Sequence, residues 1–209
     1  MKLTMLLISL VFLATTVEAL ATTSSPAPPP SPPPAPPCTV EMLRQRPAGD
    51  KSWPIACSHT TLGVATKELD LSGAHLSYGD FEEATFQAEG AIRLNGTGLA
   101  HAVLSGSKLI ADGGVGNALI DFTEANLAHA DLSGSKLTAT TTGDYLARTA
   151  PYSANRAIID FTAANLANAR MSGSWFDAEG DEAIIDFTEA NLANADLSES
   201  KFEVNERPG

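Results

Sequence analysis

The chain has 209 residues, which allows one ordinary domain but not two large ones. It carries 13 Lys and Arg against 25 Asp and Glu, so its net charge is −12. This balance disfavours binding to nucleic acids or anionic membranes, because both depend on clustered Lys and Arg.

An export signal is predicted for residues 1–21. Met1 and Lys2 precede the apolar run 3–14, and Ala-Leu-Ala at 19–21 has the small-x-small pattern of a signal peptidase site. We expect cleavage after Ala21, which leaves the net charge unchanged because one cation and one anion are removed. The alternative is an uncleaved anchor, but the run is shorter than the ~20 apolar residues of a spanning helix.

Residues 22–37 are predicted to form an extended stalk. Nine of the twelve residues at 26–37 are proline, which fixes φ and removes the backbone donor. A polyproline II spacer of roughly 35–40 Å follows from a rise of ~3.1 Å per residue. The Ser-Pro composition resembles the hydroxyproline-rich stalks of algal and plant wall glycoproteins, which implies glycosylation. A docked PxxP ligand is the alternative function of this segment.

Residues 38–68 lack repeats and are predicted to be an N-terminal cap, with a helical turn at 40–44. Terminal units of repeat proteins are atypical because they cover the exposed end of the core. Cys38 and Cys57 are the two cysteines, and in an exported chain they indicate one disulfide. A pair of free thiols is the alternative. Two sulfurs are too few for a metal site, and the sequence predicts no metal and no cofactor.

Residues 69–204 repeat with a period of five, which matches neither the 3.6 of a helix nor the 2 of a strand. A large apolar residue is the centre of each unit, and a mostly small residue lies two positions earlier. The register breaks only after every fourth unit, at 89–91, 112–119, 140–158 and 179–184. The sequence therefore has five coils of four units, at 69–88, 92–111, 120–139, 159–178 and 185–204.

The units Ala-Asn-Leu-Ala-Asn (190–194) and Ala-Asp-Leu-Ser-Glu (195–199) resemble the A-(D/N)-L-x-x consensus of the pentapeptide-repeat family. The resemblance covers residues 69–204. It implies an all-β solenoid, a right-handed quadrilateral β-helix in which four units form one coil and the central residues point inward. All four inserts should then leave the rod at one corner. Five coils at a spacing of ~4.8 Å give a rod of about 24 Å.

The residue before each centre should face solvent, so that equal positions stack into ladders. The first and third faces carry mostly Asp, the second carries Asn, and the fourth carries Lys108, Lys136, Trp175 and Lys201. His101 and His129 should also stack. Some acidic family members imitate DNA and inhibit type II topoisomerases, and this function is a further alternative. The export signal and the short rod argue against it.

No catalytic constellation is apparent, because the Ser and Asp residues recur with the five-residue period, and we expect no enzyme activity. The candidate partner-binding residues are Trp175, a large outward aromatic, and Tyr145, Arg148, Tyr152 and Arg156 in the preceding insert. Tyr, Trp and Arg dominate interface hot spots. The alternative is that this insert folds over Trp175 as local packing.

The sequence thus predicts a secreted, non-catalytic module that binds an unidentified protein through its corner inserts. The alternatives are a structural wall or matrix protein and a protein of the thylakoid lumen. Asn95 lies in an Asn-Gly-Thr sequon and is a candidate glycosylation site. Only the tail 205–209 follows the last coil. Its backbone edge therefore has little to cover it, and a homodimer through that coil is expected. No contact with nucleic acid, or with a membrane after signal removal, is expected.

Overall fold

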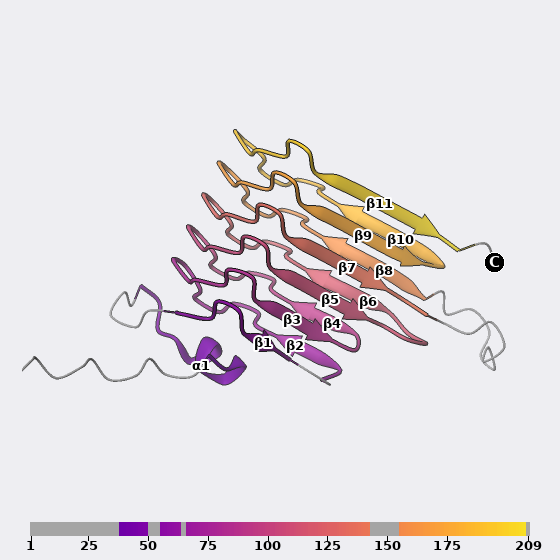
Figure 1. The fold of residues 1–209 in the computed structure, drawn as a ribbon, viewed down its shortest axis with the longest axis horizontal. Coiled ribbons are helices and arrows are strands. Elements are labelled where there is room, and N and C mark those ends of the chain that lie inside the picture. The colour runs from indigo at the N-terminus through magenta and orange to yellow at the C-terminus, as the bar shows by residue number, and fades with distance from the viewer. Residues whose placement is uncertain (1–37, 50–54, 64–65, 143–154, 208–209) are drawn as a thin grey trace, which may run out of the picture. The chain divides into compact units, whose positions relative to one another are not determined.

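The computed structural model describes residues 38–49, 55–63, 66–142 and 155–207, which form a parallel β-solenoid of five coils with an N-terminal cap (Figure 1). The predicted all-β quadrilateral β-helix is confirmed. Successive coils lie one above the other in chain order, so each strand pairs with its equivalents one coil away. Within the described ranges, no helix is long and apolar enough to cross a membrane.

Two parallel sheets form the fourth and first faces of the rod. The fourth-face sheet has the order β1-β3-β5-β7-β9-β11. Its strands are β1 (Thr61–Leu62), β3 (Thr85–Ala88), β5 (Lys108–Asp112), β7 (Lys136–Thr140), β9 (Trp175–Gly180) and β11 (Lys201–Glu206). The first-face sheet has the order β10-β8-β6-β4-β2. Its strands are β2 (Glu68–Asp70), β4 (Ala91–Arg93), β6 (Ala118–Asp121), β8 (Arg156–Asp160) and β10 (Glu182–Asp186).

The second and third faces are shorter, and each coil contributes a single bridging residue to them. The second-face bridges run through His75, Gly98, Asn126, Asn165 and Asn191. The third-face bridges run through Asp80, Val103, Asp131, Arg170 and Asp196. The four faces are therefore not equivalent, since two are sheets and two are ladders of isolated bridges.

Three corners of each coil are tight turns with a left-handed residue two positions after the centre. At the first corner, Ala74 N–H donates to the Leu71 carbonyl at 3.0 Å, and Gly73 has φ 66°. This is the pattern of a type II turn, which requires a positive φ at its third residue. Several corners use residues other than glycine, such as Ala163 with φ 55°. Each such residue costs about 1–2 kcal/mol of backbone strain.

The fourth corner has no such turn, and the strands continue through it into the inserts. β7 extends to Thr140 and β8 begins at Arg156, both inside the predicted insert 140–158. Every insert joins a strand of the fourth-face sheet to the next strand of the first-face sheet. The expectation that all inserts leave at one corner is confirmed.

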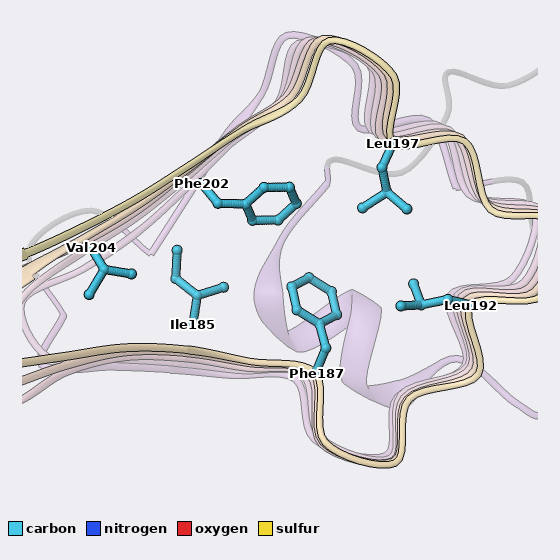
Figure 2. A pocket seen from close by; sticks show the side chains of 6 residues that line it. All are labelled: Ile185, Phe187, Leu192, Leu197, Phe202 and Val204. Atoms are coloured by element: carbon cyan, nitrogen blue, oxygen red, sulfur yellow. The ribbon is translucent and has the colours of Figure 1, made fainter.

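Beyond the fourth corner the two sheets run side by side and form what we call the arm (Figure 2). Small side chains are buried between its sheets. They are Ala88, Ala111, Ala139 and Ala178 on one side and Ala118, Ala157 and Ala183 on the other. The cross-section of a coil is therefore elongated rather than square. In coils 1–4 these arm positions are thus filled by alanine.

Inward residues of coils 1–4 form a continuous core, in which every unit centre is at most 2% exposed. Phe122, Phe161 and Phe187 stack in successive coils with ring centroids 4.8 Å apart. Phe176 and Phe202 form a second stack at 4.7 Å, and Phe161 meets Phe176 edge-on at 6.0 Å. Because the coils are separated by the distance at which aromatic rings stack, a ring inside the stack is covered on both faces by the rings of the coils above and below it.

The cap begins the solenoid earlier than the repeats suggest. Ala56 pairs with Asp80, so Cys57 takes the position of a unit centre and is fully buried. Cys57 N–H donates to the Asp80 carbonyl at 2.7 Å, and His59 has φ 56°, as at other corners. A partial coil therefore precedes coil 1.

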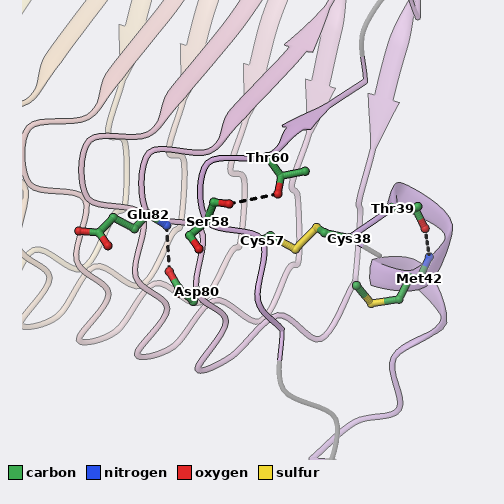
Figure 3. The surroundings of a disulfide bond; sticks show 8 residues. All are labelled: Cys38, Thr39, Met42, Cys57, Ser58, Thr60, Asp80 and Glu82. Atoms are coloured by element: carbon green, nitrogen blue, oxygen red, sulfur yellow. Dashed lines mark hydrogen bonds between the residues drawn. A yellow bond between two sulfur atoms is a disulfide. The ribbon is translucent and has the colours of Figure 1, made fainter. Parts of the chain in front are cut away.

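The predicted disulfide Cys38–Cys57 is confirmed, with Cα atoms 5.4 Å apart (Figure 3). It fastens α1 (Val40–Gln45) to the start of the rod. Thr39 caps this helix by accepting a hydrogen bond from Met42 N–H at 3.2 Å, and Leu43 is fully buried. The predicted helical turn is thus present, and it covers the first end of the core.

Removal of the disulfide should destabilise the fold. Its cysteines are 19 residues apart, and closing a loop of that size contributes about 3 kcal/mol in the chain-entropy model. We expect the Cys38→Ala, Cys57→Ala double variant to lose at least that much unfolding free energy in guanidinium titrations. Reduced wild-type protein, which keeps both sulfur atoms, is the control for the lost packing. Equal midpoints for oxidised and reduced protein would contradict the prediction.

The positive φ at the corners can be tested with two glycines in open surroundings. Gly134 has φ 65° and nothing within 4 Å of an added Cβ, so Gly134→Ala adds only backbone strain. We expect it to lower the unfolding free energy by about 1 kcal/mol. Gly98 lies outside the positive-φ region with its nearest neighbour at 3.5 Å, so Gly98→Ala should not lower the unfolding free energy and should raise it by up to about 1 kcal/mol. Similar effects of both substitutions would refute the turn assignment.

Candidate protein-binding surface

The acidic and amide ladders stabilise their own corners. Thr188 N–H donates to Asp186 Oδ1 at 2.7 Å, and Ala128 N–H donates to Asn126 Oδ1 at 3.2 Å. The same contact recurs at Asp70, Asp80, Asp121, Asp131, Asp160, Asp196, Asn165 and Asn191. Asp and Asn favour such turns because a side-chain oxygen can accept the amide two residues on. These side chains therefore have a structural explanation.

The histidine ladder is also local packing. His101 and His129 stack with ring centroids 4.8 Å apart and nearly parallel planes, as predicted. Tyr78 stacks on the other side of His101, also at 4.8 Å. In the part of the chain that the structure describes, no three His, Cys, Asp or Glu side chains gather closely enough to hold a metal ion.

Trp175 is packed by its ladder neighbours. It begins β9, and its register partners are Lys136 on β7 and Lys201 on β11. The lysine Nζ atoms lie 4.3 and 5.7 Å from the ring centroid, within the range of a cation–π contact. The residue remains 36% exposed. Much of its surface is thus covered by the rod itself.

The other predicted partner-binding residues do not join Trp175 in the described structure. Tyr145, Arg148 and Tyr152 lie outside the described residues. Arg156 begins β8, and its Nε forms an ion pair with Glu182 of β10 at 2.9 Å. The insert leaves after Thr140, which pairs with Glu179, four residues beyond Trp175. At ~3.3 Å per residue, Trp175 lies about 13 Å from that corner along the strand.

The sequon at 95–97 is part of the folded corner. Asn95 is half-buried, and its Oδ1 accepts a hydrogen bond from Ser72 Oγ at 2.6 Å. Thr97 is fully buried, and its Oγ1 donates to the Leu71 carbonyl at 3.2 Å. Glycosylation of Asn95 stays a prediction.

The last coil carries an uncovered apolar hollow of about 380 Å³ (Figure 2). Its lining residues point into the solenoid, and they are Ile185, Phe187, Leu192, Leu197, Phe202 and Val204. Phe202 and Val204 are 45% and 49% exposed, whereas their coil-4 equivalents, Phe176 and Ala178, are buried. These residues belong to the core pattern but have no following coil among the described residues.

Two strand edges border the hollow. β11 pairs with β9 alone and β10 pairs with β8 alone among the described strands, so each has one unpaired backbone edge. All six residues of β11 are exposed. Unpaired edges are templates for added strands. We call the hollow and these two edges the last-coil surface.

A comparison with known protein families points to the same repeat. The family model described as pentapeptide repeats (8 copies) matches residues 120–141, which span coil 3. One similar solved structure is that of HetL, a pentapeptide repeat protein involved in heterocyst differentiation regulation from the cyanobacterium Nostoc sp. strain PCC 7120. It is 20% identical, with 70% of this chain and 73% of that chain covered and a TM-score of 0.13. No curated protein matches significantly.

Turn formation by the Asp ladders gives stability a definite pH dependence. Hydrogen bonds from Thr188 hold the pKa of Asp186 below its usual range, and hydrogen bonds from Ser198 do the same for Asp196. A lowered pKa stabilises the folded state above the unfolded-state value near ~4, and this contribution is lost as the pH falls through the folded-state value. Asp177 behaves in the opposite way. Its burial raises its pKa, and the nearby negative charges of Glu203 and Glu179 also raise it.

We therefore expect the unfolding free energy to decrease between pH 5 and pH 3, measured by urea titration. Asp186→Asn with Asp196→Asn keeps the acceptor oxygens, as the native Asn ladder does, but cannot titrate. The double variant should lose less stability over this range than the wild type. Asp177→Asn should have the opposite effect and steepen the loss. An unchanged slope in the double variant would show that these carboxylates do not control acid stability.

Proposed function

Because the chain folds as a pentapeptide-repeat β-helix with an open last coil, we propose that it is a non-catalytic protein-binding module whose binding surface is that coil. The supporting observation is the apolar hollow between two unpaired strand edges. A protein partner can bury the apolar side chains and pair with the edges at the same time. Addition of a strand to a sheet edge is a recurring mode of recognition.

The polar side chains of the described faces are explained by the fold, so they do not point to a catalytic site. The outward Asp and Asn residues accept backbone amides at the corners, and His101 stacks between Tyr78 and His129. Their positions follow from the repeat. A catalytic group would instead need a position set by a substrate.

The corner insert 140–158 is a second candidate surface. The strands that lead into it are firmly held, since β7 pairs with both neighbours and Arg156 is fixed by Glu182. The insert therefore begins and ends on paired strands, and Tyr145, Arg148 and Tyr152 lie within it, outside the described residues. Tyr and Arg are common at the hot spots of protein interfaces, which favours the insert as a binding surface.

We also propose that the module is exported and tethered by the stalk 22–37. The signal-like residues 1–21 and the proline content support this location. A wall or matrix role in which the stalk carries the function is the alternative, and a plastid-lumen location is another. Hydroxyproline or sugar on the purified stalk would favour the wall.

The two surfaces can be separated by affinity capture from the extracellular fraction of the source cells, followed by identification and rebinding of the purified partner. Val204→Lys places a charge in the hollow, and we expect at least a tenfold loss of partner affinity. Val115→Lys is the matched control, since Val115 is 69% exposed in another insert. Thermal melts should show both variants folded.

The insert variant Tyr145→Ala, Arg148→Ala, Tyr152→Ala completes the comparison. Retained capture with this variant and lost capture with Val204→Lys support the last-coil surface. The reverse pattern assigns binding to the insert. Unchanged binding in both variants contradicts both surfaces.

A further inference from the structure

The last-coil surface is complementary to a second copy of itself. We propose that two chains associate end to end through their last coils, with β11 of each chain paired antiparallel to β10 of its partner. This inference rests on the proposed function, because it takes the last coil as the binding surface and names its occupant. Four observations carry it: the closed opposite end, the elongated coil, the edge strands and the charge pattern.

The opposite end of the rod is closed. α1 lies over the partial first coil, held there by the Cys38–Cys57 disulfide, and Leu43 is fully buried. Arg46 reinforces the cap by donating to the carbonyls of His75 and Ser77 at 2.8 and 3.0 Å. Among the described strands, β1 and β2 each keep one unpaired edge at this end, but the apolar core behind them is already covered. Head-to-tail stacking would therefore bury one apolar end only, whereas contact between two last coils buries both and closes at two chains.

The elongated shape of the coil favours a two-fold axis that runs along the arm over one that runs across it. Figure 2 shows β11 with Phe202 and Val204 on one side of the arm and Ile185 on the other, while Leu192 and Leu197 lie at the far end. A two-fold axis along the arm superimposes the outlines of both coils. An axis across the arm would point the two arms in opposite directions and leave Val204 and Ile185 uncovered. The first axis places β11 beside the partner's β10.

The pleat then limits the register, because inward residues must lie over inward residues. Phe202 faces Ile185 across the arm (Figure 2), so the axis along the arm sets Phe202 over the partner's Ile185. In antiparallel pairing, Lys201 then lies opposite the partner's Asp186, and Asn205 lies opposite the partner's Glu182. Each contact occurs twice in the dimer.

Charge favours this register over its neighbour. Lys201 is the only cation in coil 5, which contains the acids Asp186, Glu189, Asp196, Glu199 and Glu203. A slip of two residues would bring Glu203 against the partner's Asp186, and like charges directly opposite are destabilising. The proposed register instead places the one cation against a carboxylate whose second oxygen is not used by the Thr188 amide.

Sedimentation equilibrium of the mature chain, residues 22–209, from 1 to 200 µM tests the association. We expect a monomer–dimer equilibrium that Val204→Lys abolishes. Lys201→Glu replaces two attractions by two repulsions and should weaken the dimer roughly tenfold. Lys108→Glu makes the same charge change in the same ladder of coil 2, away from the end, and should have no effect. A dimer insensitive to Val204→Lys would overturn the proposal.

Cysteine cross-linking tests the register. The Asn205→Cys, Glu182→Cys variant should form disulfide-linked dimers under mild oxidation, whereas each single variant should not. Cross-linking of Asn205→Cys alone would indicate β11 beside the partner's β11 and overturn the geometry.

The two proposals fail in different ways. A monomer at every concentration whose partner capture is lost with Val204→Lys overturns self-association and leaves the last-coil surface in place. A monomer whose capture is unaffected by that variant overturns both.

Discussion

The stacking of one coil on the next at the strand spacing is the interaction on which the structure depends. Each inward residue packs on its equivalents in neighbouring coils, and each backbone group of the faces bonds across the same gap, as in the pairing of Leu137, Phe176 and Phe202. Any residue that fits one coil must therefore fit its copies. This requirement explains the five-residue period, the stacked phenylalanines and the hydrogen bond that Asn191 Nδ2 donates to Asn165 Oδ1.

Each coil of such a stack presents a backbone edge and an apolar core on which a further coil could pack, so both ends need a separate explanation. The first coil ends at a helix held by a disulfide, which hides the core behind Leu43. The last coil keeps the inward pattern through Phe202 and Val204, although both remain about half exposed. The same sequence rule that builds a core inside the rod thus creates an apolar surface at its end.

The spacing of the repeats made the coil count and the common corner of the inserts predictable, and the family resemblance implied that the unit centres point inward. The five-residue period could not predict three other features: the partial coil at Cys57, the arm and the hollow. Cys57 occupies a unit centre, but its neighbours at 55–59 lack the repeat composition, and the one available signal was its five-residue distance from Leu62. The arm was missed because Ala157 lies inside the insert 140–158, which interrupts the period, while its counterpart Ala139 is the last residue of the preceding coil. The hollow was missed because its lining residues follow the core pattern of every other coil.

The ladders also determine where function can reside. A polar residue that recurs in every coil is constrained by turn formation, as the Asp and Asn residues are, so its presence says little about ligands. The proposed recognition is therefore assigned to positions where the repetition is broken: the inserts, or the last described coil. The final coil differs from the others in that the same residues, Phe187 and Leu197, would be buried by one more layer. Under the proposed function, a partner that covers this coil would need a layer of the same width and strand spacing, which is a narrower requirement than an insert imposes.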